Sequence, residues 1–135
     1  MNDFDLDSFR IFLHLLAVSV WVGGQIVLAA LVPFLRGISP DAPRLVADRF
    51  GQVAWPFFTL AVVTGIWNLA EVDIADRSTA YSVTLAVKLL AVTVAGIAAA
   101  WHSNTTSAAV RGITGAAGLI GSVVALAFGV MMVWG

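Results

Sequence analysis

The sequence contains no cysteine, and only 11% of its 135 residues are charged. The lack of cysteine excludes disulfide bonds, thiolate metal sites and cysteine nucleophiles. The formal net charge is −1, and the few basic residues form no patch of the kind that binds nucleic acid. These function classes are therefore set aside, and no nucleic-acid partner is expected.

Hydrophobic residues make up 60% of the chain and gather in four segments that are nearly free of charge. Each segment approaches the ~20 residues that a helix needs to cross the hydrocarbon core of a bilayer. We therefore predict an all-α integral membrane protein, a four-transmembrane-helix bundle that forms a single membrane domain over residues 1–135. The predicted spans are residues 9–35, 53–71, 80–102 and 112–134.

The positions of the arginines indicate how the spans are oriented. The acidic start MNDFDLDSFR does not resemble a signal peptide, so the first span is expected to remain in the protein. The loops after the first and third spans carry Arg36, Arg44, Arg49 and Arg111, whereas the opposite side carries Arg10 and Arg77. Because basic loops stay in the cytoplasm, both termini are predicted outside. We expect a multi-pass protein of a bacterial-type inner (plasma) membrane.

Small residues recur at four-residue spacing in the third and fourth predicted spans. The two rows are Ala91, Ala95 and Ala99, and Ala117, Gly121, Ala125 and Gly129. Such rows let helix backbones approach closely in lipid, where no hydrophobic force drives helices together. We therefore predict a tight hairpin of these two spans.

The few polar residues inside the spans fall on one face of each helix. With 3.6 residues per turn, the first three spans each present one such stripe. The stripes are His14, Trp21 and Gln25; Thr64, Asn68 and Glu71; and Lys88 and His102. We expect them to face the bundle interior, where their polar groups can form hydrogen bonds.

Depth separates the two histidines. His14, Lys88 and Glu71 are predicted near the outer face, whereas His102 lies fourteen residues, roughly 21 Å, from Lys88 along the helix axis. Ligation of one haem iron by both histidines of one protomer is therefore disfavoured. His14 is the better candidate for a ligand or proton carrier. Two alternatives stay open. Lys88 could form a structural pair with Glu71 or a hydrogen bond to Asn68, and His102 could bond to the last carbonyls of its helix.

Two methionines near the end of the chain offer a different ligand type. Met131 and Met132 are predicted at the outer face, level with His14. Two thioethers beside an imidazole would suit cuprous copper, although methionines also serve as packing residues. The candidate metal ligands are His14, His102, Met131 and Met132.

The sequence resembles the copper-resistance D domain family. The similarity lies in His14, Trp21 and Gly24, in Arg49-Phe50 and Thr64-Gly65, and in Lys88-Leu89. That family has four or more membrane spans and is linked to copper uptake or tolerance. The resemblance therefore implies a membrane protein with a role in copper handling.

The sequence is also similar to the HemJ-type protoporphyrinogen oxidase family. The same spacing in the first span, Trp55-Pro56 at the start of the second, and Lys88 followed by Trp101-His102 carry this similarity. In that family a first-span histidine and the third-span lysine are implicated in function, and haem b is bound. The resemblance implies these roles for His14 and Lys88.

Three functions compete on this evidence. The first is binding of a haem-type cofactor, haem b, in a redox role, with His14 as axial ligand, Lys88 pairing with a propionate or a substrate, Trp21 on the macrocycle and Gly24 making room for it. The second is copper binding or transport. The third is a non-catalytic assembly or interaction subunit. The sequence does not decide whether the protein is an enzyme, and a homo-oligomer or a membrane partner subunit is plausible besides the lipid bilayer.

Overall fold

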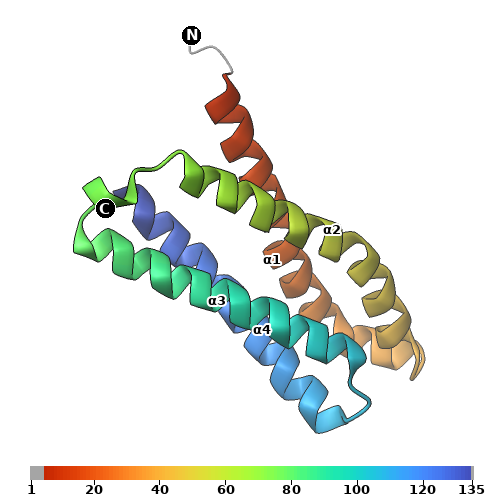
Figure 1. The fold of residues 1–135 in the computed structure, drawn as a ribbon. Coiled ribbons are helices and arrows are strands. Elements are labelled where there is room, and N and C mark those ends of the chain that lie inside the picture. The colour runs from red at the N-terminus through yellow and green to blue at the C-terminus, as the bar shows by residue number, and fades with distance from the viewer. Residues whose placement is uncertain (1–4, 135) are drawn as a thin grey trace. The chain divides into compact units, whose positions relative to one another are not determined.

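The computed structural model describes residues 5–134, which form four long α-helices and one short 3-10 helix, η1 (Figure 1). No strand occurs in this described part of the chain. All four α-helices are long and apolar enough to cross a membrane, which confirms the all-α class. Their bounds are α1 (Leu6–Ile38), α2 (Ala42–Ala70), η1 (Ile74–Asp76), α3 (Thr79–Asn104) and α4 (Ala108–Trp134).

The helices extend beyond the predicted spans, most clearly at the start of α2. This helix begins at Ala42 rather than near residue 53, so the segment through Arg49 continues into the second span as a helix. Pro43 lies in its first turn, where a missing N–H is tolerated because that group has no partner within the helix. Pro56 lies inside α2 and Pro33 inside α1, and both helices continue past them.

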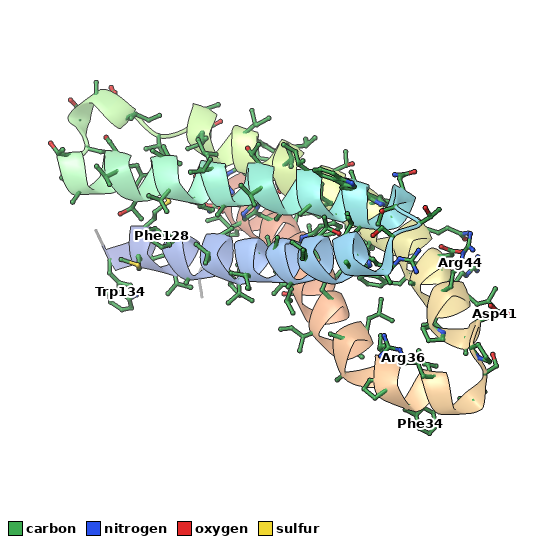
Figure 2. All side chains as sticks on the ribbon, turned by 90° about the horizontal axis from the view of Figure 1, so that it is seen from below. Phe34, Arg36, Asp41, Arg44, Phe128 and Trp134 are labelled. Carbon is green, nitrogen blue, oxygen red and sulfur yellow. The ribbon has the colours of Figure 1, made fainter. Side chains whose placement is uncertain are left out.

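The chain divides into two compact units, with the boundary between Asp73 and Ile74. The first hairpin consists of α1 and α2, and the second hairpin of η1, α3 and α4. Charged side chains gather where α1 turns into α2, as Arg36, Asp41 and Arg44 show in Figure 2. The turn of the first hairpin is therefore polar between two apolar helices.

Large aromatic side chains join the two helices of the first hairpin. The Trp21 ring lies 4.5 Å from the Phe58 ring and 5.5 Å from the Trp55 ring, measured between centroids. Further along, Phe50 covers Gly24 so closely that a Cβ at this glycine would overlap its ring. Aromatic packing of this kind replaces the hydrophobic effect, which is weak between helices in lipid.

Small residues join the two helices of the second hairpin, as the sequence predicts. A Cβ at Gly121 would lie 3.1 Å from the carbonyl oxygen of Ala91 and 3.3 Å from the Cβ of Ala95. A Cβ at Gly118 would make looser contacts, 3.7 Å from Ala99 N and 3.8 Å from the Ala98 Cβ. The tight hairpin is confirmed, and Ala98 is buried in the contact as well as the predicted Ala91 and Ala95, while Ala99 meets Gly118 through its backbone.

The outer surfaces of both hairpins carry large apolar side chains. Phe34 is 67% exposed, Leu90 65% and Val133 77%. In water such a surface would drive aggregation, whereas in a bilayer it faces lipid tails of similar polarity. The exposure pattern agrees with helices that span a membrane.

The contact at Gly121 leads to a stability prediction. Gly121→Leu should lower the thermal stability of the purified protein by about 1–3 kcal/mol, because its side chain would meet the α3 backbone. Gly112→Leu is the matched control, since nothing lies within 4 Å of a Cβ at Gly112. Thermal unfolding in mild detergent, followed by circular dichroism, measures both. Equal stability of the two variants would contradict the close packing of α3 and α4.

The start of α1 leads to a prediction about pH. Asp5 is the N-cap residue, and its carboxylate accepts a hydrogen bond from the Ser8 N–H at 2.8 Å. This bond holds the Asp5 pKa below its ordinary value of 3.8. Its contribution to the first turn is therefore complete above pH 3.8 and is lost as the pH falls through the lowered pKa. Carboxyl NMR titration should show a midpoint below 3.8, and Ser8→Pro, which removes the N–H, should raise it.

Candidate functional site

The side chain of His14 is fixed by a threonine of the neighbouring helix. His14 Nδ1 lies 2.9 Å from Thr64 Oγ1, and this hydroxyl lies 2.7 Å from the carbonyl oxygen of Leu60. A carbonyl only accepts, so the hydroxyl proton points to Leu60 and Oγ1 accepts from the Nδ1–H of His14. The neutral imidazole is thus held as the Nδ1–H tautomer, which places its lone pair on Nε2.

Gly65, next to Thr64, provides the surface on which the imidazole lies. A Cβ at Gly65 would stand 3.4 Å from His14 Cε1, so the ring is in near contact with the α2 backbone. Thr64 itself is only 2% exposed and cannot exchange its hydrogen bond for one to water. The Thr64-Gly65 pair therefore determines both the position of the His14 ring and its tautomer.

Trp21 and Gly24, which were predicted to contact a macrocycle, contact aromatic side chains of α2 instead. Trp21 is 6% exposed and packs on Trp55 and Phe58, while the space beside Gly24 is filled by Phe50. Sequence periodicity identified their face correctly but could not show which side chains of α2 would cover it. Both residues serve the packing of the first hairpin.

The other polar residues predicted to face the interior of the first hairpin differ in their burial and in their hydrogen bonds. Gln25 donates from Nε2 to the Trp21 carbonyl oxygen at 3.1 Å, and the Oδ1 atom of Asn68 is buried. Glu71 is exposed at the C-cap of α2, so its prediction as an interior residue is wrong. The helix ends one residue before it, which leaves its carboxylate beyond the packed seam.

Lys88 lies in the apolar part of α3 and packs against a glycine of α4. Its Nζ would stand 3.2 Å from a Cβ at Gly129, so the ammonium occupies the space that the glycine leaves. Within the described part of its own hairpin, the ammonium forms no hydrogen bond or ion pair with another side chain. An intramembrane charge of this kind marks a functional candidate, because it requires compensation from another group.

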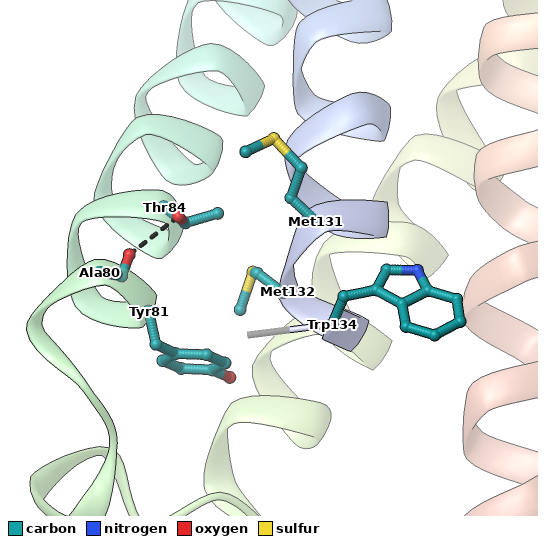
Figure 3. A pocket seen from close by; sticks show the side chains of 6 residues that line it. All are labelled: Ala80, Tyr81, Thr84, Met131, Met132 and Trp134. Carbon is teal, nitrogen blue, oxygen red and sulfur yellow. Dashed lines mark hydrogen bonds between the residues drawn. The ribbon is translucent and has the colours of Figure 1, made fainter.

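Met131 and Met132 line a pocket at the end of the second hairpin where α3 begins and α4 ends. The pocket has a volume of about 350 Å³ and is also lined by Ala80, Tyr81, Thr84 and Trp134 (Figure 3). The Thr84 hydroxyl donates to the Ala80 carbonyl oxygen at 2.8 Å and so stays within its own helix. The pocket wall therefore consists mainly of thioether and aromatic groups.

His102 connects the last turn of α3 to the first turn of α4. Its Nδ1–H donates to the carbonyl oxygen of Arg111 at 2.8 Å, and its ring lies against Gly115, whose Cβ would be 3.0 Å away. The predicted bond to the last carbonyls of its own helix is replaced by a bond to the next helix. His102 thus stabilises the turn between α3 and α4, to which Arg111 adds a bond to Thr105 O at 2.8 Å.

A common feature of these three ionisable side chains was missed from the sequence. His14, Lys88 and His102 each lie against a glycine of the neighbouring helix, namely Gly65, Gly129 and Gly115. Glycine leaves room for a polar group between helices that are otherwise close together. In an antiparallel hairpin, each of these glycines lies at the same height as its polar partner on the neighbouring helix. This match can be recognised in the sequence only when the pairing of the two helices is already known.

Comparison with known proteins adds no further constraint: the chain matches no family model, no curated protein and no solved structure.

The Thr64 contact leads to a prediction about the histidine tautomers. At a pH where both rings are neutral, ¹⁵N NMR of histidine-labelled protein should show both as Nδ1–H tautomers. Thr64→Val keeps the side-chain shape but removes the acceptor, so the His14 signals should shift toward a mixture of tautomers. The His102 signals, which depend on Arg111, should stay unchanged and serve as an internal control. A predominantly Nε2–H form of His14 in the wild type would contradict the assignment.

Proposed function

We propose that this protein binds a haem-type cofactor through His14 within the membrane and has a redox role. The observation that supports this most directly is the fixed Nδ1–H tautomer of His14. A histidine that binds a metal almost always donates its other ring N–H to a neighbouring group, which sets its orientation and basicity. The Thr64 hydroxyl takes that part here.

Each hairpin offers few side chains that could bind a metal, which suits a cofactor whose metal is already coordinated by the cofactor itself. The chain contains two histidines and no cysteine, with one histidine in each hairpin. A bare zinc ion is held by three or four protein ligands, whereas a haem iron needs only one or two axial ligands from the protein. When bound, haem would supply one-electron chemistry. His14 Nε2 fits the axial position, while Trp21 and Gly24 are already committed to helix packing.

Lys88 supports the same proposal through its charge. We assign it to an anionic group, either a propionate of the cofactor or a substrate, because an ammonium at this depth requires a counter-charge. Gly129 leaves the space in which its Nζ lies. The resemblance of His14 and Lys88 to the functional residues of the HemJ-type family agrees with these roles. A sixth iron ligand would come from another group or from a second protomer.

The arrangement in the membrane is part of the proposal. The arginines at the turn of the first hairpin, of which Figure 2 labels Arg36 and Arg44, and Arg111 near the start of α4 would face the cytoplasm, with both chain ends outside. Labelling of single cysteines introduced at Ser39 and Asp73 with a membrane-impermeant reagent distinguishes the two sides, since the chain has no cysteine of its own.

Copper binding is a second candidate, favoured by the thioethers in the pocket of the second hairpin. Met131 and Met132 both line it, and thioether sulfur prefers cuprous copper. Metal analysis of protein purified without added chelator tests this role. Stoichiometric copper that disappears in a Met131→Leu, Met132→Leu variant would support it, and copper below stoichiometry in the wild type would exclude it.

The first test of the haem proposal is the visible spectrum of the purified protein. Wild-type protein in mild detergent should show a Soret band, with α and β bands after reduction by dithionite. His14→Ala should lose this absorbance, because the axial nitrogen is gone. His102→Gln is the matched control and should keep it, since His102 is engaged with Arg111.

Two outcomes would overturn the haem proposal. Full haem stoichiometry in His14→Ala would show that another group holds the iron. A colourless, metal-free wild type whose His14→Ala variant is merely less stable would instead favour an assembly or interaction subunit, in which the polar residues hold the helices together.

A further inference from the structure

A second polar level lies next to the His14–Thr64 pair in the first hairpin. Arg10 precedes His14 by four residues on α1, and Asn68 follows Thr64 by four residues on α2. Because the helices run antiparallel and repeat every 3.6 residues, this places Arg10 and Asn68 on the same seam. They lie one turn, roughly 6 Å, beyond the histidine, toward the start of α1.

Both side chains contain buried polar atoms without a hydrogen bond. Arg10 is only 9% exposed, and its Nε and Nη1 have no partner among the described residues. The Oδ1 atom of Asn68 is likewise buried without a partner in residues 5–134. Arg10 Nη2 pairs with Asp7 at 3.2 Å, but that carboxylate is largely exposed and leaves the other donors unsatisfied.

The unsatisfied atoms indicate the chemistry of an occupant. A guanidinium is always charged and offers only donors, so its buried N–H groups need acceptor atoms. Leaving a charge buried without such atoms is strongly unfavourable. An anionic oxygen group satisfies both requirements, since charge-assisted hydrogen bonds to arginine are among the strongest in proteins. The buried Asn68 Oδ1 is itself an acceptor, so a carboxylate cannot bond to it directly. A half turn of the amide about its last side-chain bond would place Nδ2–H at this position, where it would donate to the same group.

We infer that Arg10 and Asn68 form a buried site for the carboxylate of a ligand bound at His14. This inference rests on the proposed function, in which the carboxylate is a propionate of the tetrapyrrole. Propionates extend from the edge of the ring, whereas the axial ligand binds at its centre, so the two are expected at neighbouring levels of one helix seam. Haem carries two propionates, and Arg10 would take one of them.

Titration with haem and with haem dimethyl ester tests the site, because the ester keeps the iron but removes both negative charges. The Soret shift in mild detergent gives the affinity. Wild-type protein should bind haem at least about tenfold more tightly than the ester. Arg10→Gln should lose about the same factor for haem and little for the ester, as expected for a direct pair in a double-mutant cycle. Arg10→Lys should fall between them.

Controls separate this inference from the proposed function. Arg44→Ala removes an exposed arginine of the same hairpin and should change neither affinity. Equal haem affinity of the wild type and Arg10→Gln, with binding still lost in His14→Ala, would overturn the carboxylate site and leave the haem proposal intact. Equal affinity of the wild type for haem and ester would also overturn it, as expected if a lipid phosphate occupied Arg10. Failure of the wild type to bind either compound would overturn both.

If Arg10→Gln fails to fold, Arg10→Lys, which keeps the charge but loses the guanidinium fork, is compared with the wild type on haem and on the ester instead. Asn68→Leu provides a second variant, since it removes the buried amide and keeps Arg10. It should weaken haem binding by a smaller factor than Arg10→Gln and leave the ester unaffected. Circular dichroism in the same detergent shows whether each variant keeps the helical content of the wild type.

Discussion

Hydrocarbon cannot satisfy a polar side chain, and this constraint explains most of the polar contacts in the two hairpins. Thr64 donates to the Leu60 carbonyl of its own helix and accepts from His14 on the neighbouring one. Thr84, Thr93, Thr114 and Ser122 each return their hydroxyl proton to a carbonyl one turn earlier. Lys88, Arg10 and Asn68 do not follow this pattern, and they therefore invite a functional explanation.

The two hairpins solve the packing problem in different ways. In the first, large rings from α1 and α2 interlock, with Phe50 against Gly24 and Trp21 between Trp55 and Phe58. In the second, backbones approach through Gly118, Gly121 and the alanines of α3. Both arrangements replace the hydrophobic effect with contact area. On the same seam of the first hairpin, nearer the start of α1 than the rings, His14 lies against Thr64 and Gly65.

The sequence was sufficient for the helices and for the second hairpin, because long apolar runs and small-residue rows have few other interpretations. The sequence predicted that His14 and Thr64 lie on helix faces that point to the bundle interior. It did not predict the hydrogen bond between them, because the residues of two helices that lie side by side depend on the length of the turn that joins the helices. Gly24 and Glu71 show the same limit. Periodicity assigns a residue to a face, whereas its neighbour or exposure depends on where the adjacent helix lies and ends. Arg10 appeared only as a charge for orientation, because burial cannot be seen in a sequence.

The glycines beneath His14, Lys88 and His102 have a consequence for how this protein tolerates sequence change. At most positions of a membrane helix, glycine and alanine can replace each other with little effect. At Gly115 and Gly129 the methyl group of alanine would stand 3.0 Å from the His102 ring and 3.2 Å from Lys88 Nζ, closer than an ordinary contact, whereas at Gly65 it would just touch the His14 ring at 3.4 Å. Divergent copies of this protein should therefore accept a wide range of lipid-facing residues, while Gly115 and Gly129 change only together with the polar residue that each one supports.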